Sequence, residues 1–200
     1  MMSADLGFSV FESAADATAL RLDLHGQMVM PAGIGGYLTL PLLYGSIGDE
    51  SSVDVGNLEL GGLYVLRNPG FNFIGRAGIA LPTSRSGEGG GAFVGDVAQF
   101  LNFYSDLTNL PLVVPELTTI RLSGAFEGRS GQIFYRADVG VDVFVDSPGD
   151  NPDPIGHVNL AVGADLGTIS AAVEWINLVS TDDGLSAEEA LIHGFGLSVR

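Results

Sequence analysis

The sequence contains no Cys and no Lys, and each absence narrows what the chain can be. Without Cys there is no disulfide framework and no thiolate chemistry. All eight basic residues are therefore Arg, and 24 acidic residues oppose them, which leaves a formal net charge of -16. Because so acidic a chain repels nucleic acids and anionic surfaces, we expect no nucleic-acid partner.

Charge and long apolar runs are also scarce. Charged residues make up 16 % of the chain, below the roughly 25 % of ordinary soluble domains. No apolar run approaches the roughly 20 residues of a membrane helix, so spanning by helices is excluded. No cationic start is followed by an apolar segment, and we expect that a signal peptide is either absent or already removed.

What the sequence does contain is alternation of apolar and polar residues. In ALRLDLHGQMVM, residues 19–30, the even positions from Leu20 are apolar or Gly, while the odd positions include Arg21, Asp23 and His25. This period of two predicts a strand with one apolar and one polar face. The same pattern surrounds Leu6, Phe8 and Val10 and recurs at 36–44, 56–66, 71–81, 118–128, 132–145, 157–166, 169–180 and 191–199. We therefore predict one all-β domain over residues 1–200, an antiparallel up-and-down barrel of about ten strands.

The predicted connections alternate between short and long. The short ones are 31–35, 67–70, 129–131 and 167–168, and the long ones are 12–18, 45–55, 82–117, 146–156 and 181–190. In an up-and-down barrel this places the long loops at one end and the short turns, with both chain termini, at the other.

The alternation fits two barrels that differ in which face points outward. In a soluble, lipocalin-like barrel the apolar face would enclose a ligand, and the outer face would carry few charges for a soluble protein. In a membrane barrel the polar face would line the lumen, where both signs of charge can pair. The predicted lumen or binding residues are Arg21, Asp23, Glu59, Arg76, Arg121, Glu127, Arg136, Asp138 and Asp142, with Asp165 and Glu174 on the same face. This nearly balanced mixture favours the membrane barrel, in which these residues form an ion-pair lattice or line a permeation path.

The chain resembles bacterial outer-membrane β-barrels. Besides the strand and loop pattern, GRAGIALPTS, residues 75–84, is similar to the G-x-A-L-P-T strand end of outer-membrane transporter families. The resemblance implies a bacterial outer-membrane location, with lipid, lipopolysaccharide and the barrel-assembly machinery as partners. It also implies passive transport of a small or hydrophobic solute. The chain ends at Arg200, whereas such barrels usually finish on an aromatic residue.

Two groups of apolar residues have predicted places in such a barrel. Within 82–117, Val97, Phe100, Leu101 and Tyr104 recur at helical spacing, which predicts a short helix that acts as a gate or plug, or caps the rim. The aromatic residues near strand ends, predicted to form interfacial girdles, are Phe8, Tyr37, Tyr44, Phe71, Phe144 and Trp175.

Metal binding and catalysis have weak signals. Asp146, Asp150 and Asp153 are weak candidates for Ca²⁺, and otherwise we expect no cofactor and no metal. The histidines are His25, His157 and His193. A hydrolase in which His157 or His193 pairs with Asp182 or Asp183 is an alternative, but we expect no enzyme.

A non-conducting structural or adhesive outer-membrane barrel, and the soluble ligand-binding barrel, are also compatible with the pattern.

Overall fold

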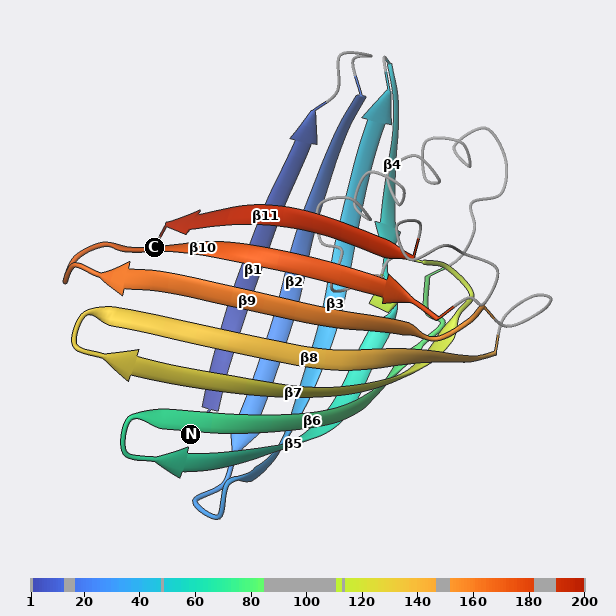
Figure 1. Ribbon diagram of the computed structural model, residues 1–200. Coiled ribbons are helices and arrows are strands. Elements are labelled where there is room, and N and C mark those ends of the chain that lie inside the picture. The colour runs from blue at the N-terminus through green and yellow to red at the C-terminus, as the bar shows by residue number, and fades with distance from the viewer. Residues whose placement is uncertain are drawn as a thin grey trace.

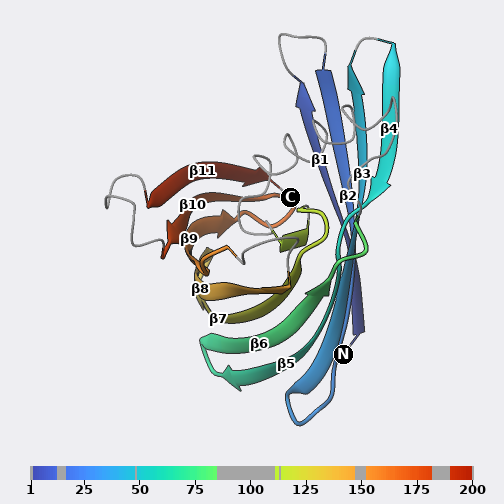
Figure 2. The same ribbon diagram turned by 90° about the vertical axis from the view of Figure 1, so that its right-hand side faces the viewer.

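The strands assemble into a single antiparallel sheet that curls into a half-barrel (Figures 1 and 2). The structure is a computed structural model that describes residues 2–12, 17–47, 49–84, 111–112, 114–146, 152–181 and 190–199. The strands are β1 (Met2–Glu12), β2 (Ala17–Val29), β3 (Ile34–Ile47), β4 (Glu50–Val55), β5 (Leu58–Asn68), β6 (Phe71–Leu81), β7 (Thr118–Ser130), β8 (Ile133–Asp146), β9 (Ile155–Asp165), β10 (Ser170–Ser180) and β11 (Leu191–Val199). Among these residues no helix is long and apolar enough to cross a membrane.

The order of strands follows the chain, which confirms the predicted all-β up-and-down fold. Neighbours run β1-β2-β3-β5-β6-β7-β8-β9-β10-β11, and β4 pairs with β3 outside this path. In the part of the chain that the structure describes, β1 and β11 are the two ends of this path, and β4 pairs with β3 alone. The described architecture is therefore a half-barrel rather than the closed barrel that we predicted.

The prediction of a loop over 45–55 was wrong, because this stretch contains β4. β3 continues to Ile47, and Glu50–Val55 folds back along it, with Ile47 opposite Glu50 and Leu42 opposite Val55. At Pro41 the neighbour of β3 changes from β5 to β4. Proline suits such a point because it lacks the N–H that a continuous ladder needs, while its carbonyl still accepts a hydrogen bond from the Gly56 N–H at 2.8 Å.

The four short connections are tight turns, each with one glycine at positive φ. These are Gly33, Gly70, Gly131 and Gly167, with φ of 85°, 96°, 62° and 96°. Glycine adopts this conformation without the steric cost that other residues meet. In Figure 1 these turns and both chain ends lie along the left and lower rim, opposite the strand ends that lead into the long connections, as the alternation predicted.

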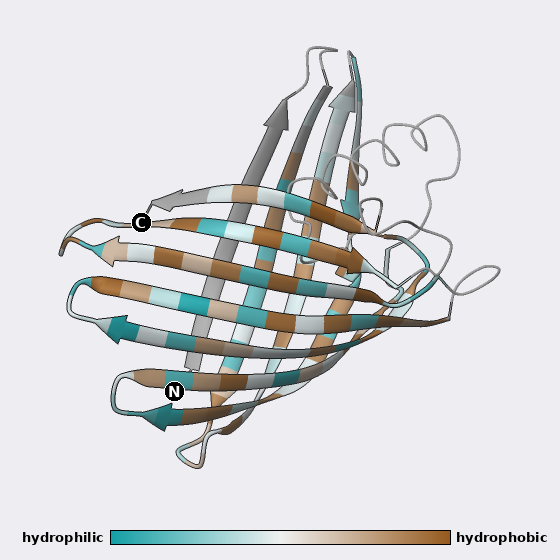
Figure 3. Ribbon diagram, in the orientation of Figure 1, coloured by the Kyte–Doolittle hydropathy of each residue, from teal (hydrophilic) through white to brown (hydrophobic). Residues whose placement is uncertain are grey.

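The apolar side chains point away from the concavity, and the polar side chains point into it. Large exposed hydrophobic residues occur along the whole sheet, among them Val139 (57 % exposed), Val162 (56 %) and Val173 (53 %). Arg21, Glu59 and Asp142, by contrast, are at most 5 % exposed. The alternation of hydropathy along single strands is visible in Figure 3. Two small apolar clusters complete the interior, one of Val29, Tyr37, Leu63 and Val65 and the other of Leu117, Phe144, Val114 and Ile155.

Asn57, just before β5, ties the stems of the 82–117 connection to the sheet. Its side-chain amide donates to the carbonyls of Pro111 at 2.8 Å and Val114 at 2.7 Å, and its Oδ1 accepts from the Ser84 N–H at 3.0 Å. The Asn57 backbone N–H also donates to the Leu112 carbonyl at 2.8 Å. Since Asn57 is fully buried, these bonds are not exchanged with water, and they fix where the connection leaves and rejoins the sheet.

We expect Asn57→Ala to destabilise the fold by about 2–4 kcal/mol, because it leaves buried carbonyls of the connection without their donor. The urea midpoint of the refolded protein measures the loss. Asn72→Ala, on the partly exposed surface of β6, is the matched control and should cost under about 1 kcal/mol. Equal losses in the two variants would contradict the role given to Asn57.

Candidate functional site on the concave face

The predicted lumen residues share the concave face, where they form several ion-paired groups instead of one continuous lattice. Arg21 pairs with Asp23 on β2, with Nε 2.8 Å from Oδ1. Among the other predicted residues, Glu59, Arg121 and Asp142 form a central group, while Glu127, Arg136 and Asp138 form a second group nearer the short turns.

The central group consists of Tyr37, Glu59, Arg121 and Asp142, contributed by four different strands. Arg121 donates from Nη1 to Glu59 Oε2 at 2.8 Å and from Nε to Asp142 Oδ1 at 2.9 Å. The Tyr37 hydroxyl donates to Glu59 Oε1 at 2.6 Å, so both carboxylate oxygens of Glu59 are bonded. Because one guanidinium bridges two buried carboxylates, the group holds β3, β5, β7 and β8 together across the concavity.

Small residues on β5 and β6 make this central group possible. Arg121 on β7 lies opposite Gly78 of β6, which in turn lies opposite Gly61 of β5. Glu59 is two residues from Gly61 along β5, so the Arg121 side chain reaches it diagonally across β6. A Cβ at Gly78 would lie 2.4 Å from the Tyr37 hydroxyl oxygen and 3.1 Å from Glu59 Oε1. Gly61 likewise faces the Tyr37 ring, with a built Cβ 2.4 Å from it. Glycine at both positions therefore leaves the space that the tyrosine and the ion pair occupy.

Arg76 extends the central group along β6. Its guanidinium lies 5.7 Å from the centroid of the Tyr37 ring, within the range of a cation–π contact. Arg76 is thus brought to the same site as Glu59 and Arg121, as the shared face predicted.

The second group joins Glu127, Arg136, Asp138 and His157. Arg136 contacts Glu127 Oε1 at 3.1 Å and Asp138 Oδ2 at 3.5 Å, and His157 Nε2 lies 3.3 Å from Asp138 Oδ1. The Arg136 side chain is 42 % exposed, against 12 % for Arg121. The second group is therefore in contact with solvent, and its ion pairs contribute less to stability.

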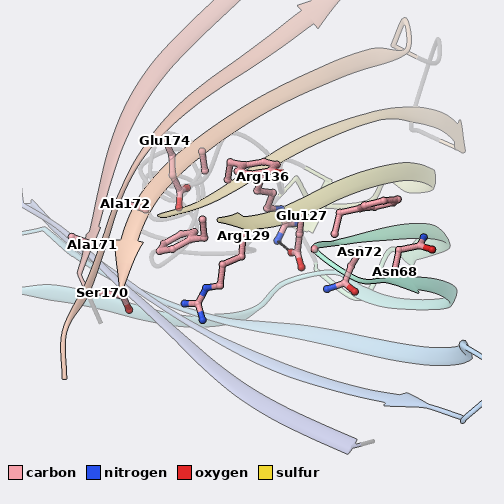
Figure 4. Close-up of a pocket in the computed structure, with 15 residues that line it drawn as sticks. Asn68, Asn72, Glu127, Arg129, Arg136, Ser170, Ala171, Ala172 and Glu174 are labelled. Carbon is pink, nitrogen blue, oxygen red and sulfur yellow. Dashed lines mark hydrogen bonds and ion pairs between the residues drawn. The ribbon is translucent and has the colours of Figure 1, made fainter. Parts of the chain in front are cut away.

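A cavity of about 560 Å³ opens beside the second group, near the short turns (Figure 4). Figure 4 shows Glu127, Arg129, Arg136 and Glu174 around it, with Asn72 next to Glu127 and Asn68 beyond it, on the side away from Glu174. The remaining lining includes Phe134, Ala161, Ser170 and Ala172. A cavity of this size is within the range of small-molecule sites.

Sequence reasoning missed the roles of Tyr37, Phe144 and His157. Tyr37 and Phe144 were expected in an interfacial girdle, but both are buried, at 9 % and 5 % exposure. Tyr37 is at an odd position of β3, in the row of Gln27 and Gly61, so strict attention to the period of two places it on the polar face. Trp175 and Phe71 are exposed on the apolar face, at 42 % and 38 %.

The described residues form neither the catalytic pair of the hydrolase alternative nor the weak Ca²⁺ candidate. His157 is buried beside Asp138 rather than at the rim, and His193 contacts Phe195 edge-to-face at 6.5 Å. Asp182, Asp183 and Asp150, and the predicted gate residues Val97, Phe100, Leu101 and Tyr104, lie outside the described residues. Asp146 ends β8, Asp153 is exposed, and the described residues contain no group of three side chains that could hold a metal.

No family model matches the chain, and a search of curated proteins finds no match.

The two arginine groups predict very different effects of the same substitution. Arg121→Met leaves Glu59 and Asp142 as buried, uncompensated carboxylates, and we expect it to cost about 3–5 kcal/mol. Arg136→Met removes an exposed pair and should cost at most about 1 kcal/mol. Urea unfolding of the two refolded variants measures the difference, and similar losses would show that Arg121 does not hold the concave face together.

Proposed function

We propose that this chain is an outer-membrane β-barrel that transports a small or hydrophobic solute passively through a narrow lumen. The observation that carries the proposal is the orientation of the two faces of the sheet: the apolar face is exposed and the charged face is buried and paired. In water this arrangement would be costly, whereas in a bilayer the apolar face meets hydrocarbon.

The outward positions of the sheet support contact with lipid. Away from the strand ends, the outward rows of β5 to β10 contain Leu, Ile, Val, Phe, Tyr, Trp, Ala and Gly, with Asn177 as the one polar residue, and the described residues there include no Asp, Glu or Arg. Such an uncharged band over six neighbouring strands is unusual for soluble monomers, which rarely expose large contiguous apolar patches. The soluble, lipocalin-like alternative places these side chains inside, which is opposite to their exposure.

A membrane location also requires that the half-barrel closes, and we propose that β1 pairs with β11. An open edge leaves backbone N–H and C=O groups without partners, which hydrocarbon cannot satisfy. The main path contains ten strands, so the first and last run in opposite directions and can form an antiparallel pair. Closure would turn the concave face into a lumen lined by the two ion-paired groups.

The lumen in this proposal is narrow, because the central group crosses it from four strands. Transport would then depend on the space beside Arg121 and on the connection 82–117. We assign this connection the role of gate or plug because its apolar residues recur at helical spacing. The ends of that connection meet at the sheet, with the Glu116 N–H 3.3 Å from the Ser84 carbonyl.

Single-channel recording in planar bilayers tests transport directly. We expect small, intermittent conductance from the full chain and larger, steadier conductance when residues 85–110 are replaced by a short Gly-Ser linker. This replacement keeps Pro111, Val114 and Ser84, which bond to Asn57. Absence of conductance from both proteins would overturn transport and favour a structural or adhesive barrel.

A pair of arginine substitutions on β9 tests which face meets lipid. Leu160→Arg places a charge on the outward face, where a bilayer midplane penalises it by about 2–4 kcal/mol. Ala161→Arg places the same side chain on the concave face, beside Glu174. We expect Leu160→Arg to reduce the fraction of folded protein recovered in liposomes, measured by heat-modifiable gel mobility, and Ala161→Arg to leave it unchanged. Equal recovery of the two variants would contradict a lipid-facing apolar surface.

A further inference from the structure

The cavity near the short turns carries separated charges of both signs, and we propose that it binds a small zwitterion with one ammonium and one carboxylate group, such as a dipeptide. This ligand would be the substrate class of the proposed transport function, and its role as a transported solute rests on that function. Binding at the cavity is argued from the geometry of the cavity itself.

The register of four strands builds the charged part of the cavity. Glu127 on β7, Arg136 on β8, Ala161 on β9 and Glu174 on β10 are consecutive residues of one row across the concave face. Because neighbouring strands are about 4.8 Å apart, Arg136 and Glu174 begin roughly 10 Å from each other. The methyl group of Ala161 between them leaves a gap with a cationic side and an anionic side.

Glu174 is the carboxylate of the cavity that is available to a ligand. In the described part of the chain it makes no ion pair, although it is only partly exposed and lines the cavity. In a concavity where Glu59, Asp142, Glu127 and Asp138 are each paired with an Arg, an unpaired carboxylate is suited to accept a hydrogen bond from an incoming ammonium group.

Arg136 and Arg129 supply the opposite charge. Arg136 is 42 % exposed, and its contacts to Glu127 and Asp138 are 3.1 and 3.5 Å long, so its guanidinium is open to a further acceptor. Arg129, which pairs with Asp165, is 57 % exposed and lies toward the same cavity in Figure 4. A guanidinium binds a carboxylate in bidentate geometry, which fits the acid end of the solute.

The rest of the cavity suits the uncharged middle of such a molecule. Ala161 and Ala172 form a small apolar floor and Phe134 adds an aromatic wall. Asn72, which lies opposite Glu127 on β6, and Asn68 also line the cavity and can donate to and accept from a peptide group. An anion alone would meet Glu127 and Glu174, and a cation alone would meet Arg129 and Arg136, whereas a zwitterion is attracted by both ends of the cavity.

Equilibrium dialysis of the full chain, refolded in detergent, against labelled L-alanyl-L-alanine tests the proposal. We expect saturable binding that weakens at least about tenfold when the dipeptide is N-acetylated, which removes the ammonium, or amidated, which removes the carboxylate. Glu174→Gln should weaken binding of the dipeptide by a similar factor and leave binding of the N-acetyl form unchanged. The matched control Glu50→Gln, on β4, should bind as the unaltered protein does.

Two results would overturn the proposal: no saturable binding by the unaltered protein, or equal affinity of the unaltered protein and Glu174→Gln for the dipeptide. Ala161→Leu provides a second test, because the larger side chain fills the gap without changing any charge, and it should abolish binding while the heat-modifiable band persists. Conductance without dipeptide binding would reject the zwitterion site and leave the transport function standing. Dipeptide binding by a protein that stays soluble without detergent would reject the membrane function and retain the site.

Discussion

The double ion pair of Arg121 with Glu59 and Asp142 is the interaction on which the concave face depends. A buried guanidinium between two buried carboxylates is stable only when each donor and acceptor is satisfied. The Tyr37 hydroxyl donates to the second carboxylate oxygen of Glu59. Gly61 and Gly78 leave the space that the tyrosine side chain occupies. The ion pair therefore requires specific residues on four strands, and it links β5 to β7 across β6 in a way that the backbone ladder does not.

This constraint also explains why the charge on the chain is distributed as it is. Most charges within the strands lie on the concave face, where Arg21, Arg121, Arg129 and Arg136 each pair with at least one acidic side chain. The opposite face is left to uncharged side chains, and it is exposed rather than packed against a second layer. A sheet of this kind needs another partner for its apolar face, and a lipid bilayer is the partner that the proposed function supplies.

Much of this fold could be predicted because the period of two is a local property. The alternation in residues 19–30 correctly assigned Arg21 and Asp23 to one face, and glycine-containing short connections marked tight turns at Gly70, Gly131 and Gly167. β4 could not be predicted in the same way, since its acidic sequence resembles a loop and its pairing depends on the length of β3. The pairing of Arg121 with Glu59, and of His157 with Asp138, depends on which strands are neighbours and on a glycine between them, which no single stretch of sequence reveals.

The outward orientation of the apolar face is tested most directly by Trp175, the single tryptophan of the chain, which is 42 % exposed on the outward face of β10. Its fluorescence can be recorded after reconstitution into bilayers of ordinary and of acyl-chain-brominated phosphatidylcholine. For a lipid-facing Trp175 we expect a blue-shifted emission that is strongly quenched by the brominated chains and insensitive to iodide in the water. Emission that iodide quenches and brominated lipid leaves unchanged would place Trp175 in water and contradict a membrane barrel.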